Sequence, residues 1–395
     1  MQGTSPYLVA RMRGFGTTIF SEMSALAIET GSINLGQGFP DTDGPQEVLD
    51  AAIEAIRAGH NQYPPGRGIP TLRQAIADHQ QLYYGLGYDP DREILVTAGA
   101  TEAIAATVLA LCETGDEVVV LEPTYDSYAA SIALAGAVMR PVTLRHPDYR
   151  LDIEAVRAAL SPRTRLLLIN SPHNPTGRVL DRAELTAIAE LAIERDLIVV
   201  TDEVYEHLTF DREHIPLATL PGMRERTVTI SSAGKTFSCT GWKIGWICAR
   251  PALLDAVATT KQFLTYVNGA PFQHAIVAGL ALPEGRIEAI RTNLRERRDQ
   301  LRGGLLAAGL DVHPCEGTYF LTVDVASLGE SDGLSFCRAL PERIGVVGIP
   351  SSVFYLDPGP ARSLVRFAFS KRPEVLDEAV RRLAELGANS VRSPA

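Results

Sequence analysis

The chain has 395 residues, of which 46% are hydrophobic and 21% charged, a composition typical of a folded globular protein long enough for two domains. Its formal net charge of −10 and the lack of any basic run exclude nucleic acid and anionic membrane surfaces as expected partners. Five scattered cysteines without CxxC spacing, and the lack of a signal-peptide pattern or a membrane-spanning apolar run, lead us to expect a cytoplasmic protein.

In chain order, the first part of the sequence predicts isolated elements. Apolar spacing indicates a short helix over 20–27 and another over 71–84. Between them, a brief strand at Ile33 breaks into a Gly/Pro turn, and the loop 61–68 is stiffened by two prolines. Tyr63 stands directly before those prolines, so its backbone must be extended.

From residue 94 the pattern becomes regular, with apolar, β-branched strands alternating with helices. Strands are predicted at 94–97, 117–121, 165–170, 197–201 and 227–230, and helices at 101–112 and 181–195. Asp181 and Glu184 form a capping-box pattern at the start of the second helix. Strands of this kind are typical of a mainly parallel sheet covered by helices on both faces, so we predict an α/β fold.

A shift in composition near Pro283 indicates a second, smaller domain. It begins with a long amphipathic helix, followed by strands at 317–323 and 364–369 and a closing helix from about Glu374. The predicted organisation has three parts: an N-terminal arm that joins the small domain, a large domain and a small α+β domain, at 1–43, 44–283 and 284–395.

Four unusual segments each follow a predicted strand: 99–102, 171–177, 202–205 and 231–235. In an open parallel sheet, ligands bind outside the carboxyl ends of the strands. We therefore expect these four segments to form one pocket. The eight histidines show neither HExxH nor HxH spacing, so we expect no metal in it.

One side of the expected pocket suits an aldehyde and a phosphate. Lys235 follows a strand among small residues, where partial burial is expected to weaken its preference for the charged form. A neutral amine there can form a Schiff base with an aldehyde. The helix opening at Ala100 and Thr101 offers free N–H groups to a phosphate, and Ser232 and Lys243 add a hydroxyl and a cation.

The other side suits an aromatic ring with a basic nitrogen. Asp202 leaves a buried strand and needs a cationic partner such as a protonated ring nitrogen. Asn174 and Tyr205 are placed to bind a phenolate oxygen, and Tyr125 to stack on the ring. Simpler alternatives stay open for single residues: a loop lysine for Lys235, a helix N-cap for Thr101 and a salt bridge for Asp202. Together the groups indicate pyridoxal 5′-phosphate.

Taken in order, these motifs resemble the class I/II aminotransferases of pyridoxal-phosphate fold type I, over almost the whole chain. The matching stretches are Asn34-Leu-Gly-Gln-Gly-Phe-Pro40, Asn170-Ser-Pro-His-Asn-Pro-Thr-Gly177, Asp202-Glu-Val-Tyr205, Ser231-Ser-Ala-Gly-Lys235 and Val365-Arg-Phe367. The sequence is most similar to the branch that holds N-succinyldiaminopimelate, kynurenine/glutamine and methionine aminotransferases. The resemblance implies a seven-stranded sheet and a homodimer.

The resemblance also implies a role for each matched residue. Lys235 would carry the cofactor and shuttle the proton, Asp202 would keep the ring nitrogen protonated, and Arg366 would bind the substrate α-carboxylate. The remaining expected contacts are Gly36 to the substrate, Asn174 and Tyr205 to the phenolate, Tyr125 to the ring, and Ala100, Thr101, Ser232, Lys243 and the other subunit's Tyr63 to the phosphate. For Arg366, a salt bridge inside the small domain is the simpler alternative.

We expect an aminotransferase that moves an amino group from an amino acid to a 2-oxo acid by a ping-pong mechanism. Asn268-Gly269 stands where aromatic-substrate members carry Phe-His, which favours a long acidic donor such as N-succinyldiaminopimelate, with Arg67 as a second cation. The alternatives are a kynurenine-, glutamine- or methionine-type aminotransferase and a carbon–sulfur β-lyase. A non-catalytic regulator is disfavoured. Both X-Pro bonds of the 171–177 loop, Ser171–Pro172 and Asn174–Pro175, are expected to be cis.

Overall fold

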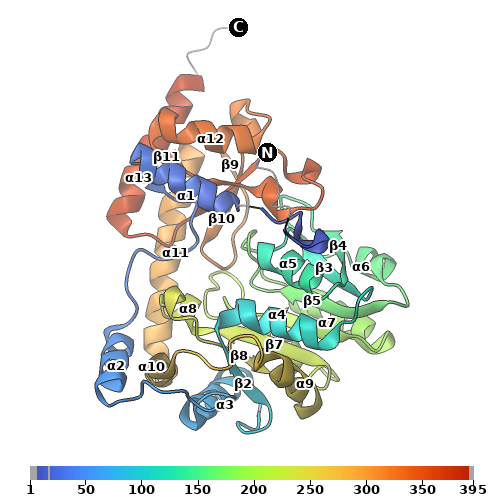
Figure 1. The fold of residues 1–395 in the computed structure, drawn as a ribbon. Coiled ribbons are helices and arrows are strands. Elements are labelled where there is room, and N and C mark those ends of the chain that lie inside the picture. The colour runs from blue at the N-terminus through green and yellow to red at the C-terminus, as the bar shows by residue number, and fades with distance from the viewer. Residues whose placement is uncertain (1–6, 17, 391–395) are drawn as a thin grey trace.

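The computed structural model describes residues 7–16 and 18–390 (Figure 1). Its α-helices are α1 Ile19–Thr30, α2 Gln46–Arg57, α3 Pro70–Tyr84, α4 Gly99–Leu111, α5 Asp126–Leu134, α6 Ile153–Ala159, α7 Arg182–Glu194, α8 Ala233–Thr236, α9 Pro251–Lys261, α10 Ala270–Leu280, α11 Glu284–Ala307, α12 Gly333–Ile344 and α13 Pro373–Ser390. Its strands are β1 Ile33–Asn34, β2 Ile94–Thr97, β3 Glu117–Glu122, β4 Val138–Thr143, β5 Thr164–Asn170, β6 Ile198–Asp202, β7 Thr227–Ser232, β8 Gly245–Cys248, β9 Asp311–Val312, β10 Phe320–Asp324, β11 Val346–Val347, β12 Ile349–Pro350 and β13 Leu364–Ala368.

The central sheet has seven strands in the order β2-β8-β7-β6-β5-β3-β4. All strands run parallel except β8, which lies antiparallel between β2 and β7. The five strands predicted from β-branched and apolar runs are all present, each within one or two residues of the expected bounds. The sequence did not predict β4 and β8, because β4 contains Arg140 and Pro141 and β8 directly follows a glycine-rich turn. The predicted α/β fold with a mainly parallel sheet is confirmed.

Helices cover both faces of this sheet because its strands are apolar on both sides. Leu166 and Leu168 of β5 pack in one hydrophobic cluster with α4, α5 and α9. Leu167 and Ile169, which alternate with them, pack against α6 and α7 on the opposite face. Near β2 and β8, the helices α2, α3 and α10 form a further apolar cluster. This burial on both sides holds the strand ends in fixed positions.

The ends of several helices follow directly from local sequence. The side chain of Asp181 caps α7 and Glu184 returns a bond to the backbone of Asp181, so the predicted capping box is confirmed. Pro70 occupies the first turn of α3, where its missing N–H costs no hydrogen bond. Gly85 ends the same helix in the left-handed conformation.

The C-terminal part forms a second layer around α11, the long helix that connects the two ends of the molecule in Figure 1. A four-stranded antiparallel sheet, β12-β13-β10-β9, packs there with α12 and α13. The N-terminal segment joins this layer, because β1 pairs in parallel with β11 and Met23, Ala27 and Leu35 share its hydrophobic core. The domain bounds at 43 and 283 stay a prediction. Within the described residues, we find no helix of the length and apolar character that a bilayer crossing requires.

Candidate active site

The ends of neighbouring strands bring the predicted segments to one edge of the sheet. Asn170 and Asp202 lie side by side at the ends of β5 and β6, and Asp202 is paired with Ile230, two residues before the end of β7. On the other side, Gly245 of β8 is paired with both Ser232 of β7 and Thr97 of β2. The loops that follow β2, β5, β6 and β7, and the loop that precedes the antiparallel β8, therefore lie at the same edge of the sheet.

A cavity of about 270 Å³ opens between these loops, close to the lower end of the usual range for small-molecule sites. Nine of the twelve predicted site residues line it: Ala100, Thr101, Tyr125, Asn174, Asp202, Tyr205, Ser232, Lys235 and Lys243. Arg366 is hydrogen-bonded both to Asn174, which lines the cavity, and to the backbone of Gly36. Tyr63 is not among the lining residues.

One end of the cavity is built for an anion. The thirteen-residue helix α4 starts there at Gly99, and its N-cap, Ala98, offers no side-chain acceptor to the first-turn N–H groups. Thr101 is therefore not the N-cap, which removes the simpler explanation for this residue. A Cβ built on Gly99 would lie 3.7 Å from the Lys243 Nζ, which places this amine at the positive end of the helix.

A close backbone contact holds this end together. A Cβ on Gly245 would lie only 2.7 Å from the carbonyl carbon of Gly99, so only glycine lets β8 approach the start of α4 so closely. Lys243, two residues earlier, has a left-handed φ of 56°. Such a conformation is uncommon for a residue with a side chain.

Asp202 lines the cavity and is buried. Its Oδ2 accepts a hydrogen bond of 2.6 Å from the Tyr128 hydroxyl, and its Oδ1 accepts one of 3.3 Å from the Val204 N–H. Burial raises the pKa of Asp202 to about 6, against the lowering effects of these hydrogen bonds and of Lys235. None of the ion pairs among the described residues involves Asp202, so a salt bridge does not account for its position.

Lys235 stands in the short helix α8, with its Nζ 5.8 Å from the centre of the Tyr205 ring and 5.9 Å from that of Tyr319. Burial by itself lowers the pKa of the amine, but Tyr319, Tyr125 and Asp202 raise it, and the pKa ends above its ordinary value. Burial therefore acts in the expected direction, but the hydroxyl groups of Tyr319 and Tyr125 and the Asp202 carboxylate outweigh it, so the predicted net lowering of the pKa is not found.

Behind the cavity, Arg366 in β13 lies fully inside the protein. It donates a 3.0 Å hydrogen bond to Asn174 Oδ1 and a 3.2 Å bond to the carbonyl oxygen of Gly36, while its Nε has no partner. Its guanidinium carbon lies 4.0 Å from the centre of the Phe320 ring. Burial lowers the pKa of Arg366 to about 10. Among the described residues no carboxylate forms an ion pair with Arg366, so the alternative of an internal salt bridge is wrong.

Three further residues that the sequence singled out lie outside this cavity. Tyr63 is 82% exposed and packs edge-on against Tyr266 beside a separate hollow. The Asn268 Nδ2 donates to the carbonyl oxygens of Thr97 and Lys243 at 3.2 and 2.9 Å, and the effect of Asn268 on the choice of substrate stays a prediction. Arg67 forms an ion pair with Asp255, which argues against its predicted role as a cation for a distal carboxylate.

Sequence reasoning missed the residues that position the predicted ones. Tyr128 lies one helical turn after Tyr125 on α5, but an isolated tyrosine gives no signal of the partner it will meet. Asn170 holds both neighbours in place: its Nδ2 donates to the Asp202 carbonyl at 2.8 Å and its Oδ1 accepts from the Asn174 N–H at 2.7 Å.

Both predicted cis bonds, at Pro172 and Pro175, are present. Two further cis bonds, Glu122–Pro123 and His146–Pro147, were not predicted.

Taken together, the cavity has the donor set that pyridoxal 5′-phosphate needs. An uncapped helix start with Ser232 and Lys243 suits the phosphate, and a buried, unpaired carboxylate suits a protonated ring nitrogen. Lys235 lines the same cavity. The residues present therefore fit this cofactor.

Comparison with known proteins gives the same answer. The family model described as aminotransferase class I and II matches residues 30–383. The chain is 53% identical over 390 residues to the probable N-succinyldiaminopimelate aminotransferase of Mycobacterium tuberculosis, which covers 96% of this chain and 98% of that protein. The chain belongs to the class I and II aminotransferases. It is also 41% identical over 379 residues to the methionine aminotransferase of Escherichia coli, over 95% of this chain and 98% of that protein.

The structural neighbours agree with this assignment. The solved structure of N-succinyldiaminopimelate aminotransferase from Mycobacterium tuberculosis matches with a TM-score of 0.94 and 54% identity, over 96% of this chain and all of that one. The protein is thus an aminotransferase of fold type I. It acts on amino acids and 2-oxo acids, and its cofactor is pyridoxal 5′-phosphate.

Proposed function

We propose that this aminotransferase takes its amino group from a long acidic donor of the N-succinyldiaminopimelate class and passes it to a 2-oxo acid in a ping-pong reaction. The observation that carries the choice of donor is the likeness to the Mycobacterium tuberculosis relative, which extends over 96% of this chain at 53% identity. The buried, unpaired Arg366 beside Asn174 supports an amino-acid donor in general, because a guanidinium fork matches a carboxylate.

We assign the chemistry to the residues that line the cavity. When bound, the cofactor supplies an aldehyde that captures an amine and a ring that withdraws electrons. The Lys235 amine would hold the aldehyde and would move the proton at the substrate Cα. Asp202 keeps the proton on the ring nitrogen, and Tyr128 fixes the orientation of its carboxylate.

The other assigned residues bind and orient. Asn174 and Tyr205 donate to the phenolate oxygen, and Tyr125 packs on the ring. Arg366 binds the substrate α-carboxylate, and the Gly36 backbone helps to position it. The phosphate is held by Ala100, Thr101, Ser232 and Lys243, together with Tyr63 of a second copy of the chain.

We also propose a homodimer in which each active site contains residues of both chains. Tyr63 is an exposed aromatic side chain in a loop stiffened by prolines, away from the cavity of its own chain. In the proposed dimer, Tyr63 binds the cofactor phosphate of the second copy.

A cytoplasmic location is supported by the five cysteines, which all lie among the described residues as buried, free thiols.

Steady-state kinetics with a fixed 2-oxo acid test the proposed donor. We expect N-succinyldiaminopimelate to give a higher kcat/KM than methionine, glutamine or kynurenine by at least about tenfold, which corresponds to about 1.4 kcal/mol of transition-state discrimination. A higher value for any of the other three donors contradicts the proposed specificity. Turnover of a sulfur-containing amino acid without any 2-oxo acid would instead identify a carbon–sulfur β-lyase.

A further inference from the structure

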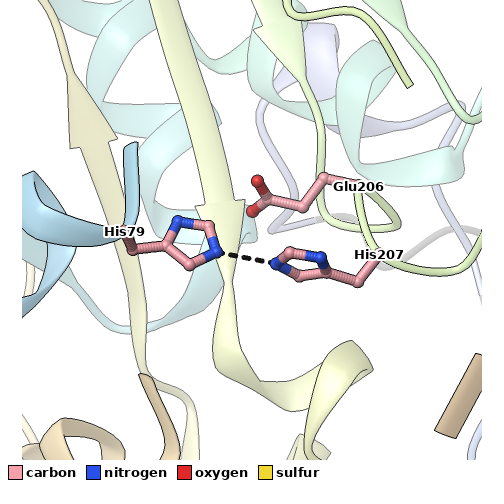
Figure 2. A group of neighbouring side chains, drawn as sticks. All are labelled: His79, Glu206 and His207. Carbon is pink, nitrogen blue, oxygen red and sulfur yellow. Dashed lines mark hydrogen bonds between the residues drawn. The ribbon is translucent and has the colours of Figure 1, made fainter. Parts of the chain in front are cut away.

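A second group of chemically versatile side chains lies outside the cofactor cavity (Figure 2). His79 comes from α3, and Glu206 and His207 follow β6 in the turn after Tyr205. One ligand atom from each of the three lies within 4.8 Å of the other two. The two Nε2 atoms of His79 and His207 point toward each other at 2.7 Å, as the dashed line in Figure 2 marks. Among the described residues, this is the single group of this kind.

The cluster is buried and held from several sides. His79 and Glu206 are each 5% exposed, whereas His207 is partly exposed. The Glu206 carboxylate accepts hydrogen bonds from the Tyr84 hydroxyl, at 2.7 Å, and from Ser231. These bonds aim the carboxylate between α3 and the turn after β6. The Nδ1 atom of His79 is buried and has no hydrogen-bond partner.

The hydrogen bond between the two imidazoles leaves lone pairs available for an ion. Burial lowers the pKa of His79 below its ordinary value and that of His207 to about 4. Burial alone would raise the pKa of Glu206, but His79, His207, Ser231 and Tyr84 lower it. In the hydrogen bond between the two Nε2 atoms, one imidazole donates and the other accepts, next to the Glu206 carboxylate.

We propose that His79 Nε2, His207 Nε2 and one Glu206 oxygen bind a divalent transition-metal ion, with zinc as the best match. Two imidazoles and a carboxylate are a three-ligand set that zinc accepts, with a fourth position left for water. Bond lengths of 2.0–2.1 Å set neighbouring ligand atoms about 3.3 Å apart. The two nitrogens must therefore separate by about 0.6 Å, which the partly exposed His207 allows. The imidazole that donates in the metal-free protein moves its proton from Nε2 to Nδ1, so no proton is released overall.

A separate cavity of about 360 Å³ gives the ion a route to the cluster. It is lined by Glu206 and His207, by the carboxylates of Glu213, Glu284 and Glu288, and by Arg291, which forms an ion pair with Glu288. Glu213 and Glu284 take part in no ion pair among the described residues, and such carboxylates raise the local concentration of cations. This cavity shares no lining residue with the one that holds Lys235, so the proposed ion is distinct from the cofactor site.

The position of the cluster indicates what the ion would do. Glu206 directly follows Tyr205, and it accepts a hydrogen bond from Ser231, which precedes Ser232. An ion bound by His79 as well would tie α3 to the turn and strand that carry these cofactor-facing residues. We therefore expect it to stabilise the site from behind and to take no part in the reaction.

Metal binding by the full-length, cofactor-loaded enzyme tests the proposal. The protein is stripped with a chelator, dialysed and titrated with Zn²⁺ by calorimetry, and bound zinc is counted by elemental analysis. We expect one zinc per chain and a higher melting temperature. His207→Gln should weaken the affinity at least about 100-fold, because it removes one of three protein ligands. Co²⁺ in the wild type should give the visible bands of a four-coordinate site, and His207→Gln should abolish them.

Two control variants separate this cluster from other histidines. His214 lines the same cavity but is hydrogen-bonded to Glu203 at 2.9 Å, and His60 is exposed and stacked on His274. His214→Gln and His60→Gln should keep the affinity within about twofold. The proposal is overturned if the wild type holds no stoichiometric zinc, or if His207→Gln and His79→Gln bind it as tightly as the controls. If both ligand variants misfold, Co²⁺ spectra of the wild type without four-coordinate bands overturn it equally.

Discussion

Lys235 is the residue whose loss should be the most damaging. Lys235→Ala should lower transamination by about 10³-fold or more, because the amine is the proposed cofactor anchor and proton carrier. Absorbance of the lysine-bound cofactor should disappear in the variant. Borohydride reduction of the wild type, followed by peptide mapping, should attach the cofactor to Lys235 and leave Lys371 unlabelled. Near-normal turnover in the variant would show that the assignment is wrong.

Asp202 should make the stability of the cofactor-free protein depend on pH. Its pKa is about 6 in the folded chain, raised chiefly by burial from an ordinary value of 3.8. Between these values the folded state binds more protons than the unfolded state, so the free energy of unfolding falls as pH rises from about 4 to about 6. The loss is on the order of 3 kcal/mol, from 1.36 kcal/mol per pKa unit.

Asp202→Asn tests this effect, because the amide keeps the shape of the carboxyl without titrating. The cofactor-free variant should match the wild type near pH 4 and should be more stable by about 3 kcal/mol at pH 7. Urea unfolding at both pH values measures the difference. Equal stability of the two proteins at pH 7 would mean that Asp202 is not desolvated as the structure indicates.

At the scale of elements, the contact between β8 and α4 should control binding of the cofactor phosphate. In Gly245→Ala the new Cβ would lie 2.7–2.9 Å from the backbone of Gly99 and Ala100, so the start of α4 must move away. We expect the dissociation constant of the cofactor to rise about tenfold or more. Gly241→Ala is the matched control, because nothing lies within 4 Å of a Cβ at that position. Fluorescence titration of both cofactor-free variants gives the comparison, and equal affinities would contradict the expected role of the contact.

For the whole molecule, the shared-site dimer can be tested by mixing two defective chains. Lys235→Ala lacks the cofactor anchor, and Tyr63→Ala lacks the side chain that we propose reaches the neighbouring phosphate. In the mixed dimer, one site combines Lys235 of one chain with Tyr63 of the other. That site should regain wild-type cofactor affinity and activity, which neither variant has by itself.

The mixing experiment needs two measurements to be decisive. Wild-type chains mixed with Lys235→Ala give the activity expected for one intact site per dimer. Tyr63→Ala should keep the fold of its own chain, because within that chain this side chain is 82% exposed. No gain of activity on mixing, in a sample shown to contain mixed dimers, would rule out a shared site.

The sequence by itself determined the pieces of the fold that depend on short-range pattern. The continuous apolar runs of β3, β5, β6 and β7, and the capping box at Asp181, are encoded within a few neighbouring residues. The strand-end positions of Asn174, Asp202 and Lys235 followed from the same pattern, because ligands of a parallel sheet collect at its carboxyl edge. These features needed no knowledge of distant contacts.

The tertiary structure alone decided which distant residues meet. Arg366 and Asn174 are 192 positions apart, Tyr128 and Asp202 are 74 apart, and the histidines of the proposed metal site are 128 apart. The sequence expectation of no metal site rested on local spacing, and such spacing carries no information about pairs of this kind. Likewise, the antiparallel placement of β8, which brings Gly245 against Gly99, results from packing of the whole sheet. Local propensity selects helices and strands, but burial of apolar surface across the molecule selects their neighbours.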